Sequence, residues 1–180
     1  MPNGPTPYHA VTHDRWSAWA ERDMARVRRA LGADCHAIHH VGSTSVLPRP
    51  GLPSTKAPVI DIAAEVRGPA LPEPALLRLL VHGFIVQEAE PACRLFVVED
   101  PATGDRRVEL RCYPAGHAEV RVLVAFYAYL RRTPDAADEY REMKHQTRLS
   151  HGASTPAYLA AKRAWIERRH AAASQVLRLA

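Results

Sequence analysis

The sequence predicts an α+β protein built on a mixed sheet flanked by helices, with a helical segment at the C-terminus. Five short apolar or alternating segments are typical of strands, and the pattern from residue 117 onward is helical. Strands and helices do not alternate regularly, so a doubly wound parallel sheet is not expected. Neither a GxxxxGK(S/T) loop nor a GxGxxG loop is present, which excludes the common nucleotide-binding motifs.

The first third of the chain contains one helix, one strand and one irregular loop. Residues 1–11 are rich in Pro and Gly and are expected to form an extended lead-in. Residues 12–31 repeat apolar side chains at helical spacing and end before Gly32, which predicts a helix. A short strand is expected at 37–41. The prolines of residues 47–58 predict an irregular loop.

The middle third is expected to supply most of the sheet. The apolar run 58–66 predicts a strand, and residues 73–82 predict a helix that ends at Gly83. Three further strands are expected at residues 84–88, 94–99 and 106–113. The polar turn 100–105 joins the last two as a hairpin with a longer loop.

The last third is expected to be helical. Pro134 and Pro156 stand near the starts of two of the helices, where proline is favoured. The three expected helices are residues 117–132, 135–150 and 156–178. The predicted organisation is a lead-in at 1–11, an α/β core at 12–116 and a helical segment at 117–180 packed on the core, as a single domain overall.

The composition favours a cytoplasmic protein with a small anionic ligand. The 180 residues carry a net charge of +5, with arginines spread along the chain, so an anionic partner is expected and nucleic acid is not. The three cysteines lack CxxC spacing and are expected to be reduced thiols. No apolar run approaches the roughly 18 residues of a membrane span, and the N-terminus lacks an apolar signal region.

The strongest local signal is the segment His-Val-Gly-Ser-Thr-Ser-Val at residues 40–46. A strand that ends in a Gly-Ser turn offers backbone N–H groups and short hydroxyls to a phosphate. The candidate phosphate or substrate ligands here are His40, Gly42, Ser43, Thr44 and Ser45. The alternative is an ordinary capped turn, since Ser and Thr are favoured there for local hydrogen bonding.

The histidines of residues 36–40 are not expected to form a zinc site, because neighbouring residues of a strand point to opposite faces.

Asp61 is the candidate catalytic carboxylate. It interrupts an otherwise apolar strand, where a carboxylate is unfavourable unless it is paired or bound to metal. It is therefore a candidate Mg²⁺ ligand or general base, and an ion pair with an arginine is the alternative. The position two residues on is Ala63, so an Asp-x-Asp metal clamp is absent.

Residues 106–113 form a strand with one polar and one apolar face. Its polar side chains are Arg107, Glu109, Arg111 and Tyr113. A solvated strand face explains the pattern without a function. Alternatively, Glu109 is a second carboxylate beside Asp61, Arg111 is a clamp for phosphate or carboxylate, and Tyr113 contacts the substrate.

Lysine is rare in this arginine-rich chain, and its three occurrences are Lys56, Lys144 and Lys162. A lysine in such a chain can serve as a point charge on phosphate, although chance explains each one separately. Tyr140 precedes Lys144 by four residues, as Tyr158 precedes Lys162, so each pair shares a helix face. These side chains either reach a polyphosphate tail or belong to ordinary packing between helices.

The motifs together resemble the GrpB family, a nucleotidyltransferase-like family that also occurs fused to some bacterial dephospho-CoA kinases. The resemblance spans roughly residues 12–170. The matching positions are residues 40–46, Gly51, Leu52, Lys56, residues 58–62, 126–131, Pro134, Ala136, Ala137, Glu139, Tyr140, Lys144, Tyr158, Ala161 and Lys162. It implies a polymerase-β-like nucleotidyltransferase fold, with Gly42 and Ser43 as the phosphate-binding turn and Asp61 as the metal position.

Two features depart from the family pattern. Residues 47–49 lengthen the loop before Lys56, and the His-Leu-His motif of the family is replaced by Glu109-Leu110-Arg111. The first departure could reshape the substrate entrance. The second changes the ligand chemistry, and it could restore a carboxylate that nucleotidyltransferases use.

The expected function is Mg²⁺-dependent transfer of a nucleotidyl group from a nucleoside triphosphate to a small acceptor. Asp61 and Glu109 would bind the metal. Gly42, Ser43, Thr44 and Lys56 would hold the phosphates. Arg111, Lys144 and Lys162 would stabilise charge. One alternative is a non-catalytic module that binds a nucleotide or coenzyme A. Another is an enzyme that uses Glu109 as a base on a small anionic metabolite.

Overall fold

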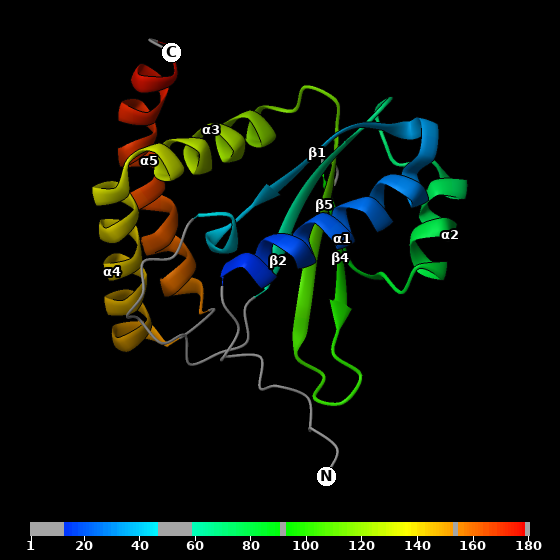
Figure 1. Ribbon diagram of the computed structural model, residues 1–180, viewed down its shortest axis with the longest axis horizontal. Coiled ribbons are helices and arrows are strands. Elements are labelled where there is room, and N and C mark those ends of the chain that lie inside the picture. Colours follow the sequence, from blue (N-terminus) through cyan, green and yellow to red (C-terminus); the bar gives the residue numbers. More distant parts are fainter. Residues whose placement is uncertain (1–12, 47–58, 91–92, 153–154, 179–180) are drawn as a thin grey trace. The chain divides into compact units, whose positions relative to one another are not determined.

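The computed structural model describes residues 13–46, 59–90, 93–152 and 155–178. The chain divides into two compact units, residues 1–120 and 121–180. The first unit carries the sheet and the second is helical (Figure 1). The division lies close to the boundary predicted at residue 117.

The first unit contains two helices and five strands in the expected order. They are α1 (His13–Leu31), β1 (Cys35–Val41), β2 (Ile60–Val66), α2 (Glu73–Val81), β3 (Ile85–Glu90), β4 (Cys93–Glu99) and β5 (Arg106–Pro114). The expected helices and strands are confirmed, with bounds that differ by at most two residues. One turn of 3₁₀ helix, Ser43–Ser45, follows β1.

The strands form one mixed sheet in the order β1-β2-β5-β4-β3. The central pair β2 and β5 is parallel, and the other three pairs are antiparallel. The predicted hairpin between β4 and β5 is present, and the predicted α+β fold class is confirmed. The parallel pairing places residues from distant parts of the sequence, Asp61 and Glu109, directly beside each other.

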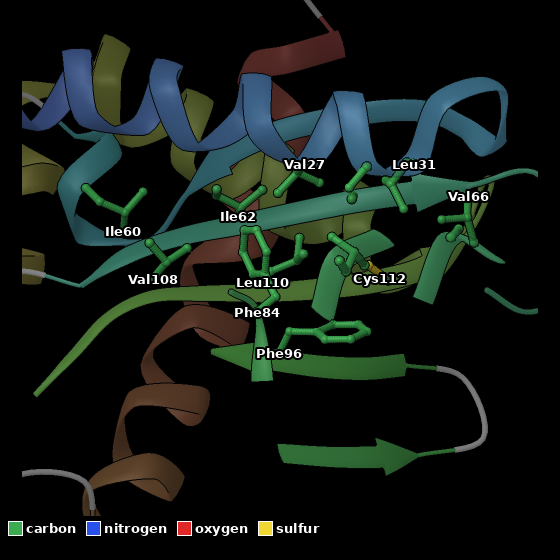
Figure 2. Packing of buried hydrophobic residues seen from close by; sticks show 14 of the residues in the cluster. Val27, Leu31, Ile60, Ile62, Val66, Phe84, Phe96, Val108, Leu110 and Cys112 are labelled. Atoms are coloured by element: carbon green, nitrogen blue, oxygen red, sulfur yellow. The ribbon is translucent and has the colours of Figure 1, made fainter. Parts of the chain in front are cut away.

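The hydrophobic core lies on one face of the sheet, between the strands and the helices α1 and α2. Ile62 and Leu110 of the central strands are fully buried there, together with Val27 and Leu31 of α1 (Figure 2). Because strand residues alternate between faces, the intervening positions of β2 and β5 lie on the opposite face. The core thus fixes which side chains of the central strands form the candidate site.

Arginines of the first unit join α1 to α2 and the segment after it. The Arg78 Nε donates to the carbonyl oxygen of Ala30 at 2.5 Å, which satisfies a carbonyl in the last turn of α1. The Arg26 guanidinium donates to the carbonyl oxygen of His82 at 2.5 Å and forms an ion pair with the buried Asp23. Apolar packing is not directional, so these polar contacts help to fix the orientation of α1 against α2.

The second unit is formed by α3 (Ala118–Arg132), which starts in the first unit, with α4 (Pro134–His151) and α5 (Pro156–Arg178). The rings of Phe126, Tyr140 and Trp165 pack together, with centroids 5.4–6.1 Å apart. Aromatic burial therefore holds these three helices together. Within the described ranges, no helix has the length and apolarity needed to cross a membrane.

Candidate functional site

The turn after β1 and the carboxylate of β2 are in direct contact. Gly42 has a φ of 76° and a ψ of −178°, a conformation that is essentially restricted to glycine. A Cβ atom built on Gly42 would lie 1.9 Å from Oδ2 of Asp61. The absence of a side chain at Gly42 therefore allows the Asp61 carboxylate to pack against the turn backbone.

Two of the three hydroxyls in this turn stabilise the turn itself. The buried Thr44 donates its hydroxyl to the carbonyl oxygen of Val59 at 3.3 Å, and the buried Ser45 donates to the carbonyl oxygen of Gly42 at 2.7 Å. Ser43 is exposed. Thr44 and Ser45 therefore act locally, as the capped-turn alternative expects, and the exposed hydroxyl is that of Ser43. A phosphate-binding role for the turn stays a prediction.

His40 supports the turn from the side of the sheet opposite to Asp61. Its Nε2 lies 3.0 Å from Thr44 Oγ1, and because that hydroxyl donates its hydrogen to Val59, the histidine nitrogen is the donor. The β1–β2 register pairs His40 with Ile62 of the core and Val41 with Asp61. The geometry thus gives His40 a contact with the turn, while the ligand role remains a prediction.

The two candidate carboxylates lie beside each other on one face of the sheet, as the alternative that made Glu109 a second carboxylate next to Asp61 expected. Asp61 of β2 pairs with Glu109 of β5, and Ala63 pairs with Arg111 in the same register. Both carboxylates are partly buried, and the side chain of Glu109 is 13% exposed. The sheet therefore brings together Asp61, Glu109 and Arg111, which are the three predicted catalytic residues.

Each oxygen of Glu109 forms an ion pair with an arginine. The Arg106 Nη1 lies 2.9 Å from Oε2, and the Arg111 Nη2 contacts Oε1. Burial lowers the pKa of the Arg111 guanidinium, but the Glu109 and Asp61 carboxylates outweigh that effect and raise the pKa above its ordinary value. The polar face of β5 therefore carries an ion-paired cluster in which Glu109 is largely buried and the two arginines are partly exposed.

Tyr113 occupies a packing position. Its side chain is 1% exposed, and its ring stacks on His117 with centroids 5.1 Å apart. Burial raises the pKa of its phenol, and the neighbouring Cys93 raises it further. The predicted contact of Tyr113 with a substrate remains a prediction.

Glu65 of β2 lies on the same face of the sheet as Asp61, four residues further along the strand. Its Oε2 accepts a hydrogen bond from the Gly116 N–H at 2.6 Å, and its Oε1 lies 3.3 Å from His39 Nε2. Burial raises the pKa of Glu65, but the Gly116 N–H and the His39 side chain lower it more, so the pKa lies below its usual value. Glu65 thereby ties β2 to the turn that precedes α3.

The remaining predicted ligands are Lys56 and three residues of the second unit. Lys56 lies outside the described residues. In the second unit, the Lys144 Nζ lies 5.5 Å from the centroid of the Tyr140 ring, so that pair shares a helix face as expected. Tyr158 is 7% exposed, and Lys162 is partly exposed. A role for Lys144, Tyr158 and Lys162 at the phosphates stays a prediction.

The carboxylates of this site suit a cation that binds together with a substrate phosphate. They suit less well a metal ion that protein side chains would hold on their own. Among the residues that the structure describes, no group of three or more His, Cys, Asp or Glu side chains could hold a metal ion. Mg²⁺ is commonly bound by one or two carboxylates together with substrate phosphates. Asp61, packed on the turn, fits this arrangement, whereas Glu109 would first have to release an arginine.

Comparisons with known proteins agree with the fold described above, an α+β protein with a mixed sheet. The model of the GrpB protein family matches residues 10–171. The chain therefore belongs to the GrpB family.

A solved structure and two curated relatives extend the comparison. The crystal structure of the conserved protein GrpB from Enterococcus faecalis is similar with a TM-score of 0.73 and 24% identity, over 90% of this chain and 94% of that one. The UPF0157 protein YqkA of Bacillus subtilis (strain 168) is 27% identical over 86% of this chain. A dephospho-CoA kinase of Mycolicibacterium paratuberculosis is 29% identical over 88% of it.

The two curated relatives are longer than the region that they share with this chain. The chain covers 43% of the Bacillus protein and 44% of the dephospho-CoA kinase, which is less than half of each.

Proposed function

We propose that this chain binds a nucleoside triphosphate at the Gly42–Ser45 turn and transfers its nucleotidyl group to a small acceptor. The observation that carries the proposal is the contact between the Asp61 carboxylate and the backbone of Gly42. It puts a candidate metal ligand next to the N–H groups that would hold a phosphate. The resemblance of the GrpB family to nucleotidyltransferases supports this choice of reaction class, and the arrangement of the site supports this choice of residues.

In the proposed reaction, the acceptor attacks the α-phosphorus and pyrophosphate leaves. The turn N–H groups and the Ser43 hydroxyl hold the phosphates, and Asp61 orients the cation that accompanies them. Mg²⁺, when bound with the nucleotide, would neutralise the charge that develops on the phosphate oxygens. The Arg111 guanidinium adds a fixed positive charge on the same face of the sheet.

The test is pyrophosphate release from each of the four ribonucleoside triphosphates, with Mg²⁺ and a panel of small alcohols, amines and acids. Asp61→Ala and Glu109→Gln are expected to lose turnover while remaining folded. Asp105→Asn, which changes an exposed carboxylate in the β4–β5 loop, is the matched control and is expected to keep it. Full turnover in both site variants would sink the proposal.

A second candidate is a module that binds a nucleotide or coenzyme A without transfer. Two observations favour it: Ala63 stands where a second metal-binding carboxylate would be, and one relative is a dephospho-CoA kinase. Stabilisation by coenzyme A or a nucleotide without Mg²⁺ and without turnover would support this module. If none of these ligands stabilises the protein, the ion-paired Glu109 and Arg111 favour a small anionic metabolite as the substrate, with Glu109 as the base.

A further inference from the structure

We propose that Arg111 is a built-in cation of the carboxylate pair Asp61 and Glu109, so that this site accepts a divalent cation at Asp61 only. The inference rests on the proposed function, because it concerns the cations that a bound triphosphate requires. It deepens that function by assigning Arg111 the charge that a second metal ion supplies in two-metal phosphoryl-transfer sites.

The register places the guanidinium where a second metal-binding carboxylate would otherwise act. Arg111 of β5 lies directly beside Ala63 of β2, two residues after Asp61 on the same face. The methyl group of Ala63 is small and buried, so it contributes neither charge nor a ligand. Position 63 therefore carries a neutral side chain, and it adjoins the strand position of a fixed positive charge.

Glu109 is already ion-paired on both of its oxygens. Its Oε2 contacts the Arg106 guanidinium, and its Oε1 contacts the Arg111 guanidinium. A metal ion that bound Glu109 would have to displace an arginine from a side chain that is only 13% exposed. It would also approach a guanidinium of the same sign in a partly buried setting, where charges interact more strongly than in water.

The choice of arginine makes this charge permanent. Arginine stays protonated throughout the physiological range and can grip a carboxylate or phosphate with a planar fork of donors. The raised pKa of Arg111 is consistent with a cation that its carboxylate neighbours stabilise. The positive charge of this site is therefore independent of metal supply, and a phosphate can meet it without a second ion.

The experiment uses Mn²⁺ alone, measured by electron paramagnetic resonance, so that it does not depend on any nucleotide. Wild-type protein is expected to bind Mn²⁺ weakly. Arg111→Met is expected to bind it about tenfold or more tightly, because one repelling charge is removed and the oxygen of Glu109 is released. Asp61→Asn added to Arg111→Met is expected to abolish the gain.

Two variants control for net charge and for folding. Arg67→Met removes the same charge from an exposed position after β2, and Arg111→Lys keeps the charge at the site. Both are expected to bind Mn²⁺ as weakly as the wild type. Arg111→Gln repeats the measurement if Arg111→Met does not melt cooperatively.

Three outcomes would overturn the inference. They are equal Mn²⁺ affinity in wild type and Arg111→Met, an equal gain in Arg67→Met, and a gain that survives Asp61→Asn. Each of these leaves nucleotide binding and pyrophosphate release intact as separate readouts, so failure of this inference is distinguishable from failure of the proposed function.

Discussion

Substitution of Gly42 by alanine tests the contact between the turn and Asp61. A side chain at the Gly42 conformation costs about 1–3 kcal/mol in backbone strain. The added Cβ would also lie 1.9 Å from Oδ2 and 2.6 Å from Cγ of Asp61, so the carboxylate must move. Displacing a packed side chain costs about a further 1–3 kcal/mol. We therefore expect Gly42→Ala to lower the free energy of unfolding by about 2–6 kcal/mol.

The loop glycine Gly104 provides a matched control. Its φ is 72°, close to that of Gly42, but a Cβ built on it meets no atom within 4 Å. Gly104→Ala should therefore show backbone strain alone, about 1–3 kcal/mol. The difference between the two variants isolates the contact with Asp61.

A double-mutant cycle completes the test in urea unfolding. Asp61→Gly removes every atom of Asp61 that the new Cβ would meet, so Gly42→Ala should cost about 1–3 kcal/mol less in that background. The reasoning is refuted if Gly42→Ala is as mild as Gly104→Ala, or if its cost is the same with and without the Asp61 side chain.

Three further predictions concern the same face and turn. Thr44→Val removes the hydroxyl that bridges His40 and the Val59 carbonyl and should destabilise by about 1–3 kcal/mol in thermal melts, whereas Thr44→Ser should be nearly neutral. Glu109→Gln weakens both ion pairs and should lower the unfolding free energy, measured in urea, by about 1–3 kcal/mol. Arg106→Gln removes only the more exposed pair, which contributes about 1 kcal/mol at most. An equal or larger loss in Arg106→Gln than in Glu109→Gln would therefore contradict this account. The folded-state pKa of Glu65 is lowered, so its stabilisation is present above the unfolded-state pKa of about 4.3 and is lost as the pH falls through the folded-state pKa. Unfolding free energies measured between pH 6 and pH 3 should therefore fall less steeply in Glu65→Gln, and parallel curves would contradict the assignment.

The elements of the fold could be predicted because their signals are local. Gly32 and Gly83 ended the first two helices, and Pro134 and Pro156 opened the last two, so those bounds were readable from single residues. Alternation also placed Asp61 and Ala63 on one face of their strand, and the register confirms it.

The parallel pairing of β2 with β5 is a property of the tertiary structure and has no local signature. It decides that Asp61 faces Glu109 and that Ala63 faces Arg111, so the ion-paired cluster emerged only with the fold. The sequence also favoured His40 as a ligand because it adjoins the turn. The structure shows it bonded to Thr44, on the face opposite to Asp61, and its role as a ligand stays a prediction. Glu65 lacked a predicted role because its main partner is a backbone N–H at Gly116, which no residue-type pattern reveals.

The central claim is that the turn after β1 binds the phosphates of a nucleotide. The most direct measurement follows the backbone amide signals of the ¹⁵N-labelled protein during titration with each nucleoside triphosphate and with coenzyme A, with and without Mg²⁺. The account predicts saturable shifts at Ser43 and Thr44 with at least one nucleotide, little change at Gly104, and loss of the Mg²⁺-dependent part in Asp61→Asn. Saturable shifts that leave Ser43 and Thr44 unmoved, or no shift with any of these ligands, would contradict it.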